Sequence, residues 1–150
     1  MATFRHAREL AASPAAVFDA FQNPARLARW WGPAGFTNTF HTFEFVPGGS
    51  WRFTMHGPNG KDYPNESAFV ELVPASLVRL RHVNLPHYDL SITVEPSASG
   101  TLLTWVGVFE NDGFAESMRD FLETANEQNL DRLAAELAAE LAGDAQSGTP

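Results

Sequence analysis

The chain has 150 residues, a formal net charge of −8 and no cysteine, and hydrophobic residues make up 44% of it. This length suits one domain, and the apolar fraction can bury a core without covalent cross-links. The negative charge disfavours nucleic acid and anionic membranes as partners, and the lack of cysteine excludes disulfides, thiolate metal sites and cysteine nucleophiles.

The first elements in chain order are a strand over residues 3–10 and two short helices. Ser13-Pro14 provides a cap and a first helical residue, and Asn23-Pro24 repeats this start signal. The second helix runs from Leu27 to about Trp31, where Gly32-Pro33 ends it.

Six further strands are predicted over residues 39–46, 50–56, 67–73, 77–82, 88–95 and 101–109. Trp51, Phe53 and Met55 alternate with polar residues and share one face of their strand. Gly-rich and Pro-rich turns at 47–49 and 57–60 join neighbouring strands, which is typical of an antiparallel meander.

A single long helix is predicted over residues 114–141. Its apolar stripe consists of Met118, Phe121, Leu122, Ala125, Leu130, Leu133 and Leu137. At about 1.5 Å per residue the helix is roughly 40 Å long, enough to cover one face of a sheet. Its acidic residues predict a solvated opposite face: Glu116, Glu123, Glu127, Glu136 and Glu140.

These elements predict an α+β domain over residues 1–142, followed by a small, polar and disordered tail over 143–150. No stretch approaches the roughly 20 apolar residues of a membrane span, and the first ten residues contain no apolar run of signal-peptide length. We therefore expect a cytoplasmic protein.

Three stretches carry a resemblance to a known family. They are residues 13–21 with 23–33 (SPAAVFDAF, NPARLARWWGP), residues 47–60 with 63–65 (PGGSWRFTMHGPNG, YPN), and residues 101–104 with 130–133 (TLLT, LDRL). Together they resemble the heat-shock-protein-90 ATPase activator homologue family of the START-like superfamily. The resemblance implies a helix-grip fold, in which a curved antiparallel sheet of about seven strands wraps around the long C-terminal helix and leaves a cavity between them.

The resemblance also implies a function class. Superfamily members bind lipids, hormones, polyketides or other apolar molecules, and some catalyse cyclisation, whereas the family name suggests a co-chaperone with a role in the stress response. The chain departs from the family pattern at Val46, where an Arg usually precedes the Pro-Gly-Gly turn. It departs again at Ala125-Asn126, where many members have Gly-Trp.

The candidate ligand-binding residues are mostly apolar and come from the central strands and the long helix. They are Trp51, Phe53, Met55, Phe69, His82, Trp105, Met118, Phe121, Leu122 and Asn126. A cavity that serves a ligand should hold about 300 Å³ or more, with Asn126 and His82 as its polar points. Alternation alone does not separate a hollow core from a filled one, so both interpretations stay open.

Several polar residues have a structural and a functional interpretation. A buried His82 either orients a ligand or makes structural hydrogen bonds, and the second interpretation is favoured. Glu44 and Glu71 are either general acids in the cavity or carboxylates on the sheet surface, near arginines of neighbouring strands. Trp30-Trp31 either forms a docking patch or packs a helix end onto the sheet, and burial is favoured.

The sequence therefore predicts a protein that encloses an apolar or aromatic small molecule, with no cofactor and no metal. The alternatives are an interaction module that docks on a chaperone, and a cyclase or hydrolase that uses the same cavity. A fold by itself does not decide among these functions.

Overall fold

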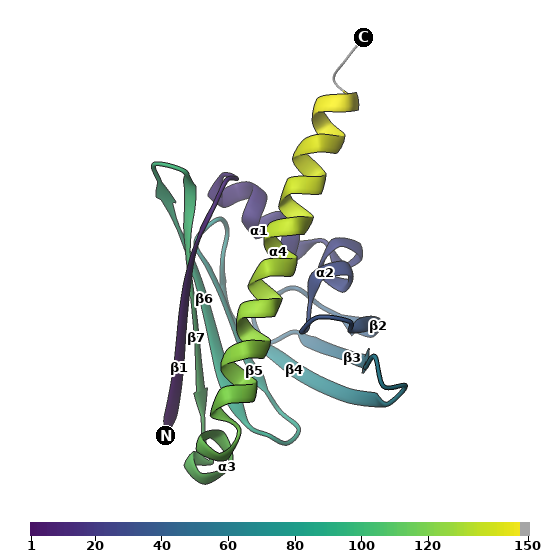
Figure 1. The fold of residues 1–150 in the computed structure, drawn as a ribbon, viewed down its shortest axis with the longest axis vertical. Coiled ribbons are helices and arrows are strands. Elements are labelled where there is room, and N and C mark those ends of the chain that lie inside the picture. The colour runs from purple at the N-terminus through teal and green to yellow at the C-terminus, as the bar shows by residue number, and fades with distance from the viewer. Residues whose placement is uncertain (148–150) are drawn as a thin grey trace.

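Seven strands form one antiparallel sheet in the computed structural model, which describes residues 1–147 (Figure 1). The strands are β1 (Ala2–Leu10), β2 (Thr37–Phe43), β3 (Ser50–His56), β4 (Asp62–Val73), β5 (Leu77–His82), β6 (Tyr88–Ser97) and β7 (Gly100–Phe109). Their order across the sheet is β1-β7-β6-β5-β4-β3-β2. Strands 2 to 7 form the expected meander, and β1 joins it at the side of β7.

Two short helices, α1 (Pro14–Gln22) and α2 (Pro24–Trp30), follow β1 as predicted. The Ser13 hydroxyl accepts a hydrogen bond from the backbone N–H of Ala16, and the side-chain Oδ1 of Asn23 accepts from those of Ala25 and Arg26. These bonds satisfy N–H groups that the first turn of a helix leaves without partners. The α+β helix-grip architecture is thus confirmed.

The prediction of a single helix over residues 114–141 is wrong near the start of that range. The structure has a short α3 (Asp112–Ser117) and a separate α4 (Arg119–Ser147), with Met118 between them at φ −107° and ψ 10°. The Asn111 side chain caps α3 by accepting from Phe114 N–H. The N–H of Met118 donates to the carbonyls of both Phe114 and Ala115, which tightens the last turn of α3. Helix α4 then begins as a separate helix at Arg119.

The C-terminal boundary also differs from the expectation. Helix α4 continues to Ser147, five residues beyond the predicted domain end at 142. Residues 148–150 of the predicted disordered tail lie outside the described residues.

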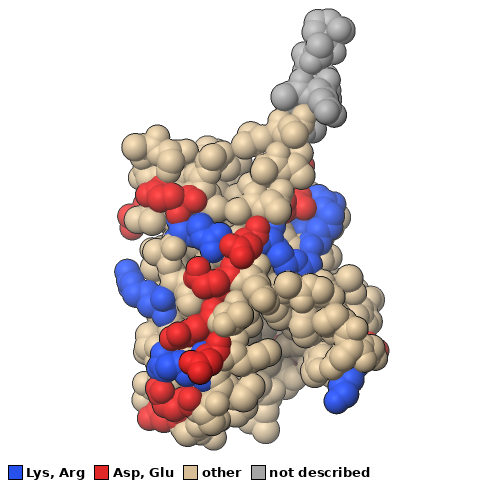
Figure 2. All heavy atoms as spheres, in the orientation of Figure 1, with Lys and Arg blue, Asp and Glu red and all other residues tan. Residues whose placement is uncertain are grey.

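Charged side chains occupy the outer face of α4 and the neighbouring edge of the sheet, where acidic and basic groups alternate in a diagonal band (Figure 2). The guanidinium of Arg119 pairs with Glu116 at 2.8 Å and with Glu123 at 2.9 Å. Such exposed pairs contribute little to stability, because water and salt screen them. Glu136 is an exception to the predicted solvated face, because it is mostly buried between Arg26 and Arg29.

The pKa of Glu136 lies below its ordinary value. The hydrogen bond from Arg29 is the main cause, and the one from Arg26 adds to it, while burial opposes both. The carboxylate therefore stays charged, and it links α4 to α2 through two cations.

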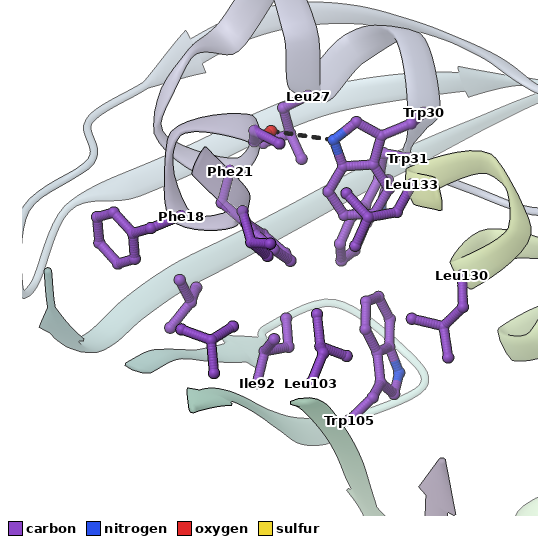
Figure 3. Close-up of a cluster of buried hydrophobic side chains, with 14 of the residues drawn as sticks. Phe18, Phe21, Leu27, Trp30, Trp31, Ile92, Leu103, Trp105, Leu130 and Leu133 are labelled. Atoms are coloured by element: carbon purple, nitrogen blue, oxygen red, sulfur yellow. Dashed lines mark hydrogen bonds between the residues drawn. The ribbon is translucent and has the colours of Figure 1, made fainter. Parts of the chain in front are cut away.

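The core lies between the concave face of the sheet and helices α1, α2 and α4. Leu130, Leu133 and Leu137 are the buried residues that α4 contributes to it. Figure 3 shows Leu130 beside Trp105 of β7, and Leu133 beside the indoles of Trp30 and Trp31. The Trp30 ring N–H donates to the carbonyl of Ala20 at 3.0 Å. The prediction that Trp30-Trp31 packs as a helix end is confirmed.

Arg132 holds α4 against the connection between α2 and β2. Its Nη1 donates to the carbonyls of Trp31, Gly32 and Pro33 at 2.9–3.1 Å. Its Nη2 donates to those of Arg29 and Phe36 at 2.8 and 2.9 Å. Trp31 O also accepts from the Asn38 side chain and Pro33 O from Phe36 N–H, so the guanidinium matters most for the carbonyls of Arg29, Gly32 and Phe36.

Replacing Arg132 with Met should lower the free energy of unfolding by about 3 kcal/mol, since charge-assisted bonds are lost and carbonyls are left without donors. Urea unfolding followed by circular dichroism measures this change. The exposed Arg52 is the control, and Arg52→Met should change stability by less than about 0.5 kcal/mol. A loss below about 1 kcal/mol for Arg132→Met would show that water replaces these bonds.

Candidate functional site

The predicted lining residues of β3, β4 and β7 lie together on the concave face. Trp51, Phe53, Phe69 and Trp105 are all buried. The ring centroids of Trp51 and Phe53 lie 4.3 Å apart, and Trp31 lies 5.0 Å from Trp51 and 5.5 Å from Trp105. Trp31 from the end of α2 thus fills the space between these strands, and this part of the interior is packed with rings.

The predicted lining residues of the helix do not join that ring cluster. Leu122 packs against a second cluster formed by Ala2, Phe4, Phe109 and Ala115 at the other end of the sheet. Phe121 is 57% exposed. Nine residues of α4 separate it from Leu130, about two and a half helical turns, so it lies on the opposite face of the helix. Asn126 is half-buried and lies one helical turn from both Leu122 and Leu130.

His82 makes structural hydrogen bonds, as the favoured interpretation holds. Its buried ring stacks on Tyr88 with centroids 4.7 Å apart. Its Nδ1 lies 2.7 Å from the carbonyl oxygen of Pro86, and its Nε2 lies 2.8 Å from Oδ1 of Asn65. The Asn65 amide nitrogen donates to Tyr63 O, which fixes the orientation of that amide.

Both ring nitrogens of His82 therefore face acceptors, an arrangement that only the doubly protonated ring satisfies fully. Burial acts in the opposite direction and is the larger effect, so the pKa of His82 lies below its ordinary value of 6.5. Burial likewise raises the pKa of Tyr88 to about 12.

The His82 ring should titrate with a midpoint below 6.5. The pKa of His82 is lower in the folded protein than in the unfolded chain, so the unfolded chain takes up this proton first as the pH falls through about 6.5. His82 therefore lowers the free energy of unfolding below that pH and leaves it unchanged above that pH. Proton NMR of the five histidines measures the midpoint, and the resonance missing in His82→Phe assigns it. A midpoint at or above 6.5 would mean that the two acceptors outweigh burial.

Glu44 and Glu71 lie on the surface. Both are exposed, and Glu71 is paired in register with Arg79 of β5. Neither carboxylate lies in the interior, so the interpretation as sheet-surface groups is confirmed. Within residues 1–147, no three His, Asp or Glu side chains are grouped so as to hold a metal ion.

A pocket of about 920 Å³ lies at the end of the sheet where α3 begins. The β5–β6 connection and the β7–α3 turn form its walls, and both lie at the end of the sheet that holds the N-terminus (Figure 1). The lining residues are Leu85, Pro86, His87, Phe109, Glu110, Asn111, Asp112 and Phe114. We call this hollow the sheet-end pocket.

The apolar wall of the sheet-end pocket consists of rings that continue into the protein. Phe109 lies 6.5 Å from Phe114, 4.9 Å from Tyr88 and 5.5 Å from Phe4. Leu85 is 79% exposed at the rim. Four of the lining residues are polar or charged, so the pocket combines an apolar wall with a polar rim.

The polar rim of the pocket is held by ion pairs. Glu110 lies 2.6 Å from Arg81 and 3.4 Å from His87, and Asp112 lies 2.9 Å from the amino group of Met1. These pairs link the β5–β6 connection, the β7–α3 turn and the N-terminus to one another. A smaller hollow of about 260 Å³ borders α2 and α4, where Arg29, Glu136 and Arg132 already bond to one another or to backbone carbonyls.

The family model for "Activator of Hsp90 ATPase homolog 1-like protein" matches residues 11–138. The chain belongs to this family. The match extends from the end of β1 to the buried part of α4, so it includes the ring cluster and the sheet-end pocket. No curated protein matches the chain.

Solved bacterial structures share the fold. A protein from Chromobacterium violaceum is 26% identical, with a TM-score of 0.80 over 90% of this chain and 96% of the other. A Silicibacter pomeroyi protein of the same family is 26% identical, with a TM-score of 0.76 over 93% and 99%. A Nitrosomonas europaea protein has a TM-score of 0.85 over 93% and 96% at 21% identity, which supports the fold alone.

Proposed function

We propose that this family member is a small-molecule binding protein that takes an apolar or aromatic ligand in the sheet-end pocket. The observation that carries the proposal is a pocket of about 920 Å³ with Phe109 and Phe114 in its wall. Its size falls within the range of drug-sized and cofactor-sized sites, which hold roughly 300–1,000 Å³. The sequence predicted such a site among the central strands, where rings instead pack on one another.

Exposed apolar side chains gather around the same end of the molecule. Leu85 lies on the β5–β6 connection, Phe114 on α3 and Phe121 in the first turn of α4. Removing such side chains from water is favourable by about 25 cal/mol for each Å² of apolar area. A ligand that covers them while its body enters the pocket gains this free energy.

Docking on a chaperone, as the family name suggests, is the second candidate, because the same exposed side chains could contact a protein. Ligand binding is favoured because Phe109, Pro86 and Phe114 surround a hollow, whereas a docking surface needs no depth. The two functions differ in which substitutions matter. Filling the hollow would block a ligand and leave a surface contact in place.

The neutral fluorescent probe N-phenyl-1-naphthylamine tests the pocket directly. Its emission should rise when it binds the wild-type protein, and Leu85→Ser and Phe114→Ala should each weaken binding by about tenfold, the effect of losing one large apolar contact. Val46→Ser is the matched control, since Val46 is also exposed but lies on the β2–β3 connection. Equal affinity in all four proteins, or an equal loss in the control, would place binding outside the pocket.

A further inference from the structure

His6 of β1 has a ring nitrogen whose environment the fold does not explain. Its side chain is only 10% exposed, and its Nδ1 lies 2.6 Å from the Glu127 carboxylate of α4. Its Nε2 is buried and makes no hydrogen bond to any residue of the described chain. A buried polar atom without a partner destabilises the folded state and is rare in native proteins, so it points to an interaction that the chain itself does not supply.

Glu127 determines which hydrogen His6 carries. A carboxylate only accepts hydrogen bonds, so the contact at 2.6 Å requires a hydrogen on Nδ1. In the neutral ring, Nε2 is then an acceptor with a free lone pair. Arg8 lies 3.2 Å from Glu127 and 2.9 Å from Asp131, so it helps to hold the Glu127 carboxylate in place.

A gap in the interior lies next to His6. Gly107 is buried in the middle of β7, opposite Phe4 in register, while His6 is opposite Trp105. A methyl group on Gly107 would meet one atom within 4 Å, Cε1 of Phe109 at 3.8 Å. Its φ is not positive, so the backbone does not require glycine there. Glycine inside a strand often marks a place where a ligand approaches closely.

The gap and the sheet-end pocket share one side chain. Phe109 lines the pocket and also borders the gap at Gly107. Because Phe109 pairs with Ala2 in register, the distance along β1 from the pocket to His6 is four residues, or about 13 Å.

We propose that Nε2 of His6 accepts a hydrogen bond from the polar end of the bound molecule, and that this end occupies the gap at Gly107. The inference rests on the proposed function, because the apolar body of the ligand would lie in the sheet-end pocket. The ligand class is an apolar molecule of about 10–13 Å with a hydroxyl or amine at one end.

Two probes of nearly equal shape test the hydrogen bond. 4-Hexylphenol has a donor at one end, and 4-hexylanisole has a methyl ether in its place. Isothermal titration calorimetry should show about tenfold tighter binding of the phenol to the wild-type protein, the factor expected for one buried hydrogen bond. His6→Phe should abolish this preference, while His41→Phe, a change at an exposed histidine of β2, should preserve it.

Two further variants keep the test decisive if His6→Phe does not fold. Glu127→Ala frees the His6 tautomer and should reduce the preference for the phenol to about threefold or less. Gly107→Ala should raise or preserve the melting temperature, because it fills a void in a strand, yet it should weaken binding of the phenol about tenfold. Loss of binding in a variant that is at least as stable as wild type separates a ligand site from a structural defect.

The outcomes distinguish this inference from the function on which it rests. Equal binding of both probes to the wild-type protein would overturn the inference and retain the apolar pocket, with a water molecule as the partner of Nε2. A preference that survives His6→Phe would also overturn it. Binding of neither probe would overturn the inference together with the proposed function.

Discussion

The position of α4 depends on the five hydrogen bonds that Arg132 donates to the connection between α2 and β2. One guanidinium binds backbone carbonyls from Arg29 to Phe36, and Asn129 adds a bond to Trp30. These contacts hold the middle of α4 over the ring cluster, where Trp31 fills the space above Trp51. Arg132 therefore holds α4 against the densely packed part of the interior, the ring cluster.

The first turns of α4 are attached differently. Leu122 packs on a small cluster, Glu127 bonds to His6 and Arg8, and Phe121 faces solvent. The backbone at Met118 departs from helical geometry, and the hydrogen bonds that connect α3 to α4 there are those from Met118 N–H to Phe114 and Ala115 and from Leu122 N–H to Met118. A wall with few apolar contacts is easier to displace than a packed one, which suits the border of a binding site.

The sequence was sufficient to predict the architecture and the packing of single residues. Caps at Ser13 and Asn23, alternation in β3 and the turns between strands are local signals, and the structure agrees with them. The burial of His82 followed from alternation alone. Its partners did not, because Asn65 and Pro86 come from other segments that meet it only in the folded chain.

The sequence predicted the binding site less well than the fold. The apolar stripe of residues 114–141 continues across Met118, so periodicity gave no sign that the helix is interrupted there. Phe121 was included in that stripe although it lies nine residues, about two and a half turns, from Leu130. The sheet-end pocket is built from two segments that are separated in sequence, residues 85–87 and 109–114. The five acceptors of Arg132 lie about 100 residues away in sequence, and an arginine within a leucine stripe usually extends to solvent.

The central claim is that a ligand binds at the end of the sheet and leaves the part of α4 around Arg132 unchanged. Hydrogen–deuterium exchange with and without a saturating concentration of 4-hexylphenol tests this claim. The account predicts slower amide exchange in residues 83–87 and 109–122 when the ligand is present, and unchanged exchange in residues 129–137. Slowed exchange confined to residues 37–56, or none anywhere despite binding, would contradict it.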